Sequence, residues 1–211
     1  MAPDSTFETV STSKAHGGTL GVYRHQSTAT GTGMTFSVFL PPQAEAGGKL
    51  PVLFYLSGLT CTHANVMEKG EYRKAAAELG VIIVCPDTSP RGEGVADAPD
   101  DWKLGCGAGF YVDASEAPWS AHYRMYSYVT AELPAVIAAN FPMADMNRQG
   151  IFGHSMGGHG ALIAAGISQL GMAAGTWASA HICVVTGTTP SILRSARYGC
   201  RRSKLVPMAC R

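Results

Sequence analysis

The chain has 211 residues, a hydrophobic content of 46% and a formal net charge of +1. These values are typical of one sizeable globular domain, and no stretch approaches the ~18 apolar residues of a membrane span. The first residues lack the basic and apolar segments of a secretory signal. We therefore expect a cytoplasmic protein with reduced cysteines and no membrane partner.

The charges are unevenly distributed along the chain. All 15 acidic residues lie at or before Asp145, whereas residues 166–211 hold six Lys or Arg and no acid. A basic segment can bind nucleic acid, but this one shows no helical period and no recognisable binding module. The six cysteines form no C-x-x-C pair and no metal-ligand spacing. We expect neither a nucleic-acid partner nor a metal site.

The first elements are predicted from alternation and from apolar runs. Residues 19–26 and 35–40 alternate apolar and polar side chains around a glycine-containing turn, which predicts an antiparallel pair of strands. The continuous apolar runs 52–56 and 81–85 predict strands that are buried on both faces.

Between these two runs, residues 71–79 predict an amphipathic helix that ends at Gly80. We expect its apolar side to consist of Tyr72, Ala75, Ala76 and Leu79.

A long loop over residues 87–122 follows, and loops of this length commonly overhang a functional site. Residues 123–139 predict a second helix, in which Pro134 either produces a kink or starts a new turn. Residues 150–152 then form a strand. This alternation predicts an α/β fold with a mostly parallel sheet. Beyond residue 165 no period persists, apart from the short apolar run 182–185.

The pentapeptide Gly153-His154-Ser155-Met156-Gly157 is the most informative motif. G-x-S-x-G between a strand and a helix forms a sharp turn that exposes a nucleophilic serine, and small neighbours give the turn its room. We therefore predict that Ser155 is a catalytic nucleophile, and that Gly160 lets the helix over 156–165 pack close to the sheet.

Backbone N–H groups near this serine are candidates for an oxyanion hole. In such sites one donor follows the nucleophile and the other lies on the loop after an earlier strand, which selects Met156 and Leu59. Gly58 would permit close approach to a ligand, although an ordinary strand-to-helix turn also explains it. Cys61 follows as a thiol near the site, or as a small buried residue.

The groups that should activate the serine are missing. The usual chain order in this fold is Ser, then Asp or Glu, then His, but no acidic residue follows Ser155 in the remaining 56 residues. We interpret His159 as a packing residue and His154 as pointing away from the pocket. His181 lacks a downstream acid to orient it.

Several stretches together resemble the S-formylglutathione hydrolase (esterase D) family of α/β-hydrolases. The resemblance covers roughly residues 5–165. Its segments are Leu56-Ser57-Gly58-Leu59-Thr60-Cys61, Ala75-Ala76-Ala77-Glu78 with the strand after it, Pro86-Asp87-Thr88-Ser89-Pro90-Arg91-Gly92, Gly107-Ala108-Gly109-Phe110-Tyr111-Val112-Asp113-Ala114, Tyr123-Arg124-Met125-Tyr126-Ser127-Tyr128-Val129, Glu132-Leu133-Pro134 and the pentapeptide with its flanks.

The resemblance implies a serine thioesterase that cleaves S-formylglutathione to formate and glutathione without a cofactor, and it leaves a homodimer open. The aromatic residues Phe110, Tyr111 and Trp119 form either a wall of the substrate pocket or part of the core. A general carboxylesterase on the same fold is the alternative substrate assignment.

The family sequence stops after residue 165. We interpret residues 1–165 as the N-terminal portion of an α/β-hydrolase domain and residues 166–211 as an atypical basic tail from a shifted reading frame, a retained intron or an alternative exon. The second hypothesis is therefore a catalytically incomplete product of such a gene, with the elbow strand left as an open sheet edge.

Overall fold

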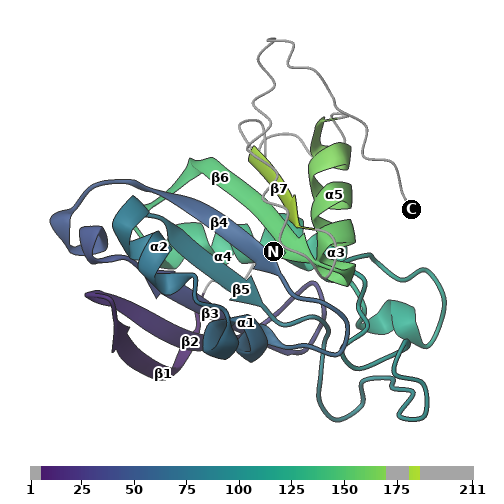
Figure 1. Ribbon diagram of the computed structural model, residues 1–211. Coiled ribbons are helices and arrows are strands. Elements are labelled where there is room, and N and C mark those ends of the chain that lie inside the picture. Colours follow the sequence, from purple (N-terminus) through teal and green to yellow (C-terminus); the bar gives the residue numbers. More distant parts are fainter. Residues whose placement is uncertain (1–5, 170–180, 186–211) are drawn as a thin grey trace, which may run out of the picture.

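A single mixed sheet organises the chain (Figure 1). The computed structural model describes residues 6–169 and 181–185, and within them the strand order is β1-β2-β3-β5-β4-β6-β7. The strands are β1 (Glu8–Ala15), β2 (Gly18–Gln26), β3 (Gly33–Leu40), β4 (Leu50–Leu56), β5 (Ile82–Pro86), β6 (Ala144–His154) and β7 (His181–Val185).

The sheet has an antiparallel half and a parallel half. β1, β2 and β3 pair in antiparallel fashion, and β3 joins β5 in the same way. β5, β4, β6 and β7 then run parallel. The predicted antiparallel pair and the two predicted buried strands are confirmed. The parallel half brings the carboxyl ends of β4, β5 and β6 to one edge, where α/β proteins place their ligands.

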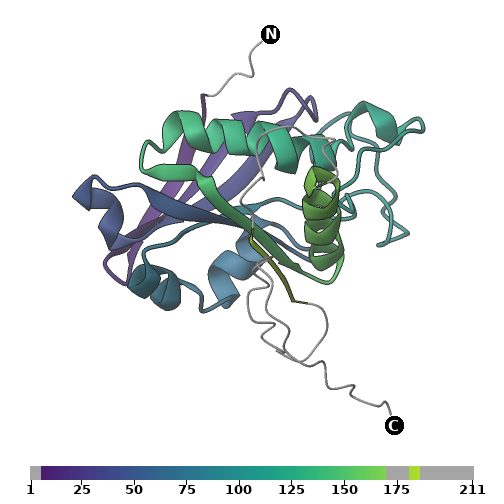
Figure 2. The same cartoon turned by 90° about the horizontal axis from the view of Figure 1, so that it is seen from above.

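Helices cover both faces of the sheet, as the view from above shows (Figure 2). The helical segments are η1 (Pro42–Ala46), α1 (His63–Lys69), α2 (Arg73–Leu79), η2 (Trp119–Ala121), α3 (Met125–Ser127), the π-helical η3 (Tyr128–Glu132), α4 (Leu133–Asn140) and α5 (Met156–Gln169). Residues of α4 and α5 share one core with the sheet, and those of α1 and α2 share the other.

The period of two in the parallel strands explains how two cores arise. In β4, Phe54 and Leu56 pack with α4 and α5, whereas Leu53 and Tyr55 pack against the cluster beneath α1 and α2. Successive side chains of a strand point to opposite faces. A continuous apolar run is therefore required when helices cover both faces.

Two predicted helices differ from the structure in detail. Tyr72 and Ala76 pack against the core as predicted, but Ala75 is exposed and Leu79 is 76% exposed, so these two were wrong. Ala77 is buried instead. Gly80 does end α2 in the left-handed conformation. The segment 123–139 contains a π-helical turn before α4, and Pro134 lies in the first turn of α4. The new-turn interpretation of Pro134 is confirmed.

Glu132 is a buried carboxylate that joins this π-helical turn to the start of the loop after β2. It accepts hydrogen bonds from Ser27 Oγ (2.5 Å), Thr28 N (2.6 Å) and Ala29 N (3.1 Å). Burial alone would raise the pKa of Glu132, but these hydrogen bonds outweigh it and hold the pKa below its usual value. The carboxylate therefore stabilises this region in its charged form.

β7 lies along the outer edge of β6, so the expectation that the elbow strand is left as an open edge is wrong. Its register pairs Gly150 with His181 and His154 with Val185. His181 thus lies about 13 Å along the strand from the end of β6 that leads to Ser155, at ~3.3 Å per residue. Most of the predicted tail over 166–211 lies outside the described residues.

Candidate active site

Ser155 occupies the turn between β6 and α5. Its backbone has φ 53°, a left-handed conformation that costs a residue other than glycine about 1–3 kcal/mol. The side chain is exposed, while the flanking Gly153 and Met156 are buried. This is the strained, outward-facing serine geometry that the pentapeptide predicts.

The glycines of the pentapeptide are required by close backbone contacts. A Cβ on Gly157 would lie 2.0 Å from the carbonyl oxygen of Leu56, and one on Gly153 would lie 2.4 Å from the carbonyl carbon of Gly157. Gly157 therefore lets the elbow approach the end of β4. A Cβ on Gly160, in contrast, would lie 2.6 Å from the ring of Tyr111, so Gly160 makes room for this ring and the prediction that it makes room for the sheet was wrong.

The loop after β4 lies directly beside the nucleophile. A Cβ on Gly58 would be 3.5 Å from Ser155 Cβ and 3.4 Å from the carbonyl oxygen of His154. Among the described residues, the N–H groups of Thr60, Cys61 and Thr62 are hydrogen-bonded, whereas that of Leu59 has no acceptor.

Met156 begins α5, and the N–H groups of a first helical turn have no partner within the helix. Both predicted oxyanion donors, Leu59 and Met156, are thus available on adjoining segments.

Tyr111 connects the long loop to this site. Its fully buried hydroxyl donates a 2.9 Å hydrogen bond to the carbonyl oxygen of Ser57, and burial raises its pKa well above the usual value, so the donor stays protonated. Of the three predicted aromatic residues, Tyr111 is therefore core. Phe110 and Trp119 line a cavity of about 290 Å³.

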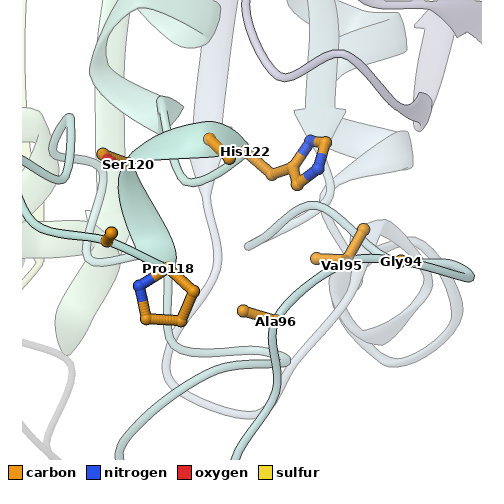
Figure 3. Close-up of a pocket in the computed structure, with 8 residues that line it drawn as sticks. Gly94, Val95, Ala96, Pro118, Ser120 and His122 are labelled. Carbon is orange, nitrogen blue, oxygen red and sulfur yellow. The ribbon is translucent and has the colours of Figure 1, made fainter.

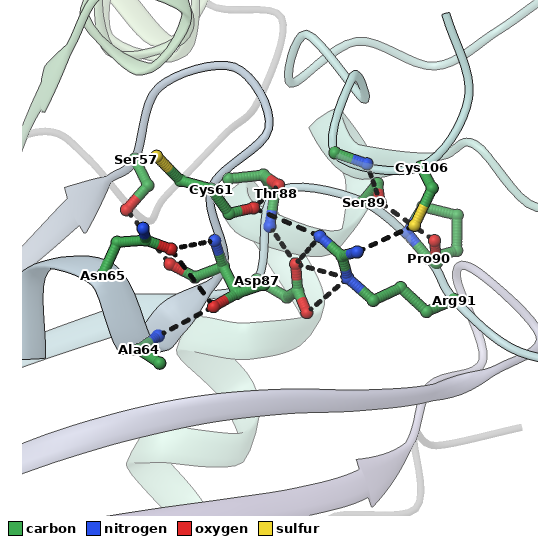
Figure 4. A network of polar contacts seen from close by, with 12 residues as sticks. Ser57, Cys61, Ala64, Asn65, Asp87, Thr88, Ser89, Pro90, Arg91 and Cys106 are labelled. Atoms are coloured by element: carbon green, nitrogen blue, oxygen red, sulfur yellow. Dashed lines mark hydrogen bonds and ion pairs between the residues drawn. The ribbon is translucent and has the colours of Figure 1, made fainter. Parts of the chain in front are cut away.

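Two residues after β5 donate hydrogen bonds to the carbonyl oxygen of Cys61, and a third holds one of them in place (Figure 4). Thr88 Oγ1 donates to this oxygen, and Arg91 Nη2 donates to it at 3.1 Å. Arg91 is itself held by two bonds from Nε to the buried Asp87 carboxylate, at 2.9 and 3.1 Å. We call Asp87, Thr88 and Arg91 the 87–91 anchor.

The loop after β4 ends in a helix cap that the sequence pattern did not reveal. The Thr62 side chain accepts from the N–H of Ala64, and Asn65 Oδ1 accepts from the N–H of Thr62 at 2.8 Å. This reciprocal capping box begins the short helix α1. Because Thr62 is the N-cap of α1, only five residues lie between the end of β4 and this helix cap.

The long loop also forms a larger cavity, of about 630 Å³ (Figure 3). His122 enters its lining but donates from Nδ1 to the carbonyl oxygen of Thr30 at 2.8 Å. The lining contains no carboxylate, so this cavity offers no acid–base pair. Its residues are Gly94, Val95, Ala96, Ala117, Pro118, Ser120, Ala121 and His122.

No histidine or carboxylate within residues 6–166 hydrogen-bonds to Ser155 Oγ. His159 is exposed, so its interpretation as a packing residue was wrong. His154 is exposed as well, and its ring lies beside Gly58. The predicted nucleophile and the predicted oxyanion loop thus lie together, and no histidine or carboxylate of these residues is bonded to the serine hydroxyl.

Metal-ligand groups and membrane-spanning helices are absent from the part of the chain that the structure describes. It contains no group of three or more His, Cys, Asp or Glu residues placed to hold a metal, and no helix that is long and apolar enough to cross a membrane. Cys61, Cys85 and Cys106 are free thiols. Burial raises the pKa of Cys85 to about 12, so this thiol is unreactive.

A mixed sheet with helices on both faces and a strained serine after β6 defines the α/β-hydrolase class. The model of the family described as "Putative esterase" matches residues 27–168. The chain belongs to this esterase family.

Among relatives, the chain is 62% identical over 156 residues to the S-formylglutathione hydrolase of Paracoccus denitrificans and 55% identical over 156 residues to that of Mus musculus. Each match covers 74% of this chain and 55% of the relative. A solved S-formylglutathione hydrolase from Agrobacterium tumefaciens has 61% identity and a TM-score of 0.73, over 75% of this chain and 56% of that one. The chain spans about half the length of these relatives.

Proposed function

We propose that this chain carries the nucleophile and the oxyanion-binding half of a serine thioesterase that cleaves S-formylglutathione to formate and glutathione. The observation that carries the proposal is the placement of the strained, exposed Ser155 beside Gly58. The substrate is suggested by a relative, because the chain is 62% identical to a protein named S-formylglutathione hydrolase.

The proposed reaction has two steps. In a catalytically complete protein, Ser155 Oγ attacks the formyl carbonyl while the histidine of the triad removes the proton of the serine hydroxyl. The N–H groups of Leu59 and Met156 hold the oxyanion. The C–S bond breaks and the glutathione thiolate leaves. Water then attacks the formyl-serine ester and releases formate by the same route.

The chain alone should be a poor catalyst. No acidic residue follows Ser155 in the sequence, and no histidine within residues 6–166 hydrogen-bonds to its hydroxyl. In a related triad, removal of the serine or the histidine costs about 10⁶ in turnover. We therefore propose that the chain by itself turns over S-formylglutathione slowly.

Glutathione release by the purified full chain tests this directly. We expect little release above that of a Ser155→Ala variant. Near-normal turnover that Ser155→Ala abolishes would show that a base and an acid reach the serine from elsewhere in the chain. Equal turnover in both proteins would remove Ser155 from the reaction.

A general carboxylesterase is the second candidate, and the apolar cavity lined by Phe110 and Trp119 favours it. The two functions differ in kcat/KM for S-formylglutathione and for a long-chain ester, measured on a catalytically complete protein. A clear preference for the thioester supports the first, and comparable values support the second.

A further inference from the structure

The segment Pro86-Asp87-Thr88-Ser89-Pro90-Arg91-Gly92 contributes no group to the proposed chemistry, yet it contacts the loop that would bind the oxyanion. We propose that Arg91 is a positioning residue: through the 87–91 anchor it holds the loop 57–62 so that the N–H of Leu59 faces Ser155. This inference rests on the proposed function for its chemistry, and on the contacts of Cys61 for its geometry.

The loop needs such support because its backbone is strained. Thr60 has φ 66°, a left-handed conformation that a residue with a Cβ keeps only when its surroundings enforce it. The N–H of Thr60 donates to the carbonyl oxygen of Gly107 at 3.0 Å. The next carbonyl, that of Cys61, is held from the other side by Thr88 and Arg91. The loop is therefore fixed immediately after Leu59.

Arg91 can hold the loop 57–62 in place because Arg91 is itself fixed to the sheet through Asp87. Asp87 directly follows β5, and its N–H donates to the carbonyl oxygen of Thr35 within β3. The planar guanidinium bonds to this carboxylate through both Nε and Nη2 and turns Nη2 toward Cys61. A lysine cannot reproduce this geometry, since its single ammonium group lacks the planar fork.

The chain offers a matched control at the opposite end of the parallel strands. Arg148 also joins a carboxylate to a backbone carbonyl: Nε donates to Asp145 and Nη2 donates to Lys49, both at 2.7 Å. Lys49 immediately precedes β4, whereas Cys61 lies beyond the other end of that strand. Arg148→Ala should therefore remove a similar set of bonds without disturbing the loop 57–62.

Two measurements test the inference, hydrogen exchange on the full chain and turnover on a catalytically complete protein that carries residues 1–165. In the first, amide hydrogen exchange is followed for Thr60 and Cys61 in the wild type, Arg91→Ala, Arg91→Lys and Arg148→Ala. Arg91→Ala should exchange about tenfold faster at these amides because the loop opens locally. Arg91→Lys should lie between it and the wild type, and Arg148→Ala should leave both amides unchanged.

The second measurement is the Ser155-dependent release of glutathione. Arg91→Ala should lower kcat by about 10–10²-fold with KM within about twofold, because a displacement near 1 Å can cost 10² in rate without changing substrate binding. Thr88→Val removes only the hydroxyl bond to Cys61 and should lower kcat less. It provides a milder variant if Arg91→Ala does not fold.

Unchanged exchange at Thr60 and Cys61 in Arg91→Ala, or an equal change in Arg148→Ala, would overturn the inference. So would an equal loss of kcat in the Arg91→Ala and Arg148→Ala variants. If the complete protein shows no Ser155-dependent release, the exchange rates in the full chain decide the inference. The proposed function would fail by a different result, namely turnover that survives Ser155→Ala in a catalytically complete protein.

Discussion

Gly157 and Leu56 approach so closely that a Cβ on the glycine would lie 2.0 Å from the leucine carbonyl oxygen. This contact seats the elbow on the end of β4, the strand that leads into the predicted oxyanion loop. A single backbone contact thus sets the spacing between the serine and that loop.

Gly157→Ala should therefore destabilise the protein. The added methyl group meets backbone atoms of Leu56 and Ser57, and overpacking of this kind typically costs about 1–3 kcal/mol. Urea unfolding measures the loss. Gly166→Ala on the same helix is the control, since nothing lies within 4 Å of its Cβ and alanine should stabilise the helix by up to ~1 kcal/mol. Equal effects of the two substitutions would contradict the packing argument.

The backbone strain at Ser155 predicts that a glycine at this position would make the protein more stable, although it would remove the proposed nucleophile. Its φ of 53° suits glycine without a penalty, so Ser155→Gly should be about 1 kcal/mol more stable than Ser155→Ala, which retains a Cβ. Thermal unfolding of the two variants gives the difference directly. If Ser155→Ala is as stable as Ser155→Gly, the turn is not strained.

The strands and the elbow could be predicted because their signals are local. The runs 52–56 and 81–85 are apolar throughout since helices cover both faces of the sheet. β1 gave no such signal: its side chains are almost all exposed and polar. α1 has only seven residues and buries none of them fully, so no apolar period marks it.

The anchor of the loop 57–62 could not be predicted for a different reason. Arg91 and Cys61 are 30 residues apart, and nothing local in either segment indicates their contact. Gly160 shows the same limit, because its partner Tyr111 comes from the long loop. Small residues predict that something approaches closely, but the approaching group is fixed by tertiary structure.

Glu132 should make the free energy of unfolding fall as the pH becomes acidic. Its folded pKa lies below the usual value, so its contribution is complete well above the unfolded pKa of about 4.3 and is lost as the pH falls through the lower, folded pKa. Glu132→Gln should cost about 1.5–3 kcal/mol at pH 7, the scale of hydrogen bonds to a charged group. It should also flatten the decline of stability between about pH 5 and pH 3.

Urea unfolding at several pH values tests this, with the exposed Glu78→Gln as control. Glu78 lies 4.0 Å from Lys74 at the surface, where such a pair contributes at most ~0.5 kcal/mol. An acid-pH profile of Glu132→Gln that parallels the wild type would show that this carboxylate is not held in its charged form.

We propose that residues 1–165 carry the nucleophile and the oxyanion loop of an S-formylglutathione hydrolase. The most direct measurement joins these residues to the part of the Agrobacterium tumefaciens enzyme that follows its matched region, and follows glutathione release from S-formylglutathione with and without Ser155→Ala. We predict rapid release by the fusion and loss of at least about 10⁴-fold in the variant. A folded fusion that releases no glutathione, or one whose turnover survives Ser155→Ala, would contradict the account.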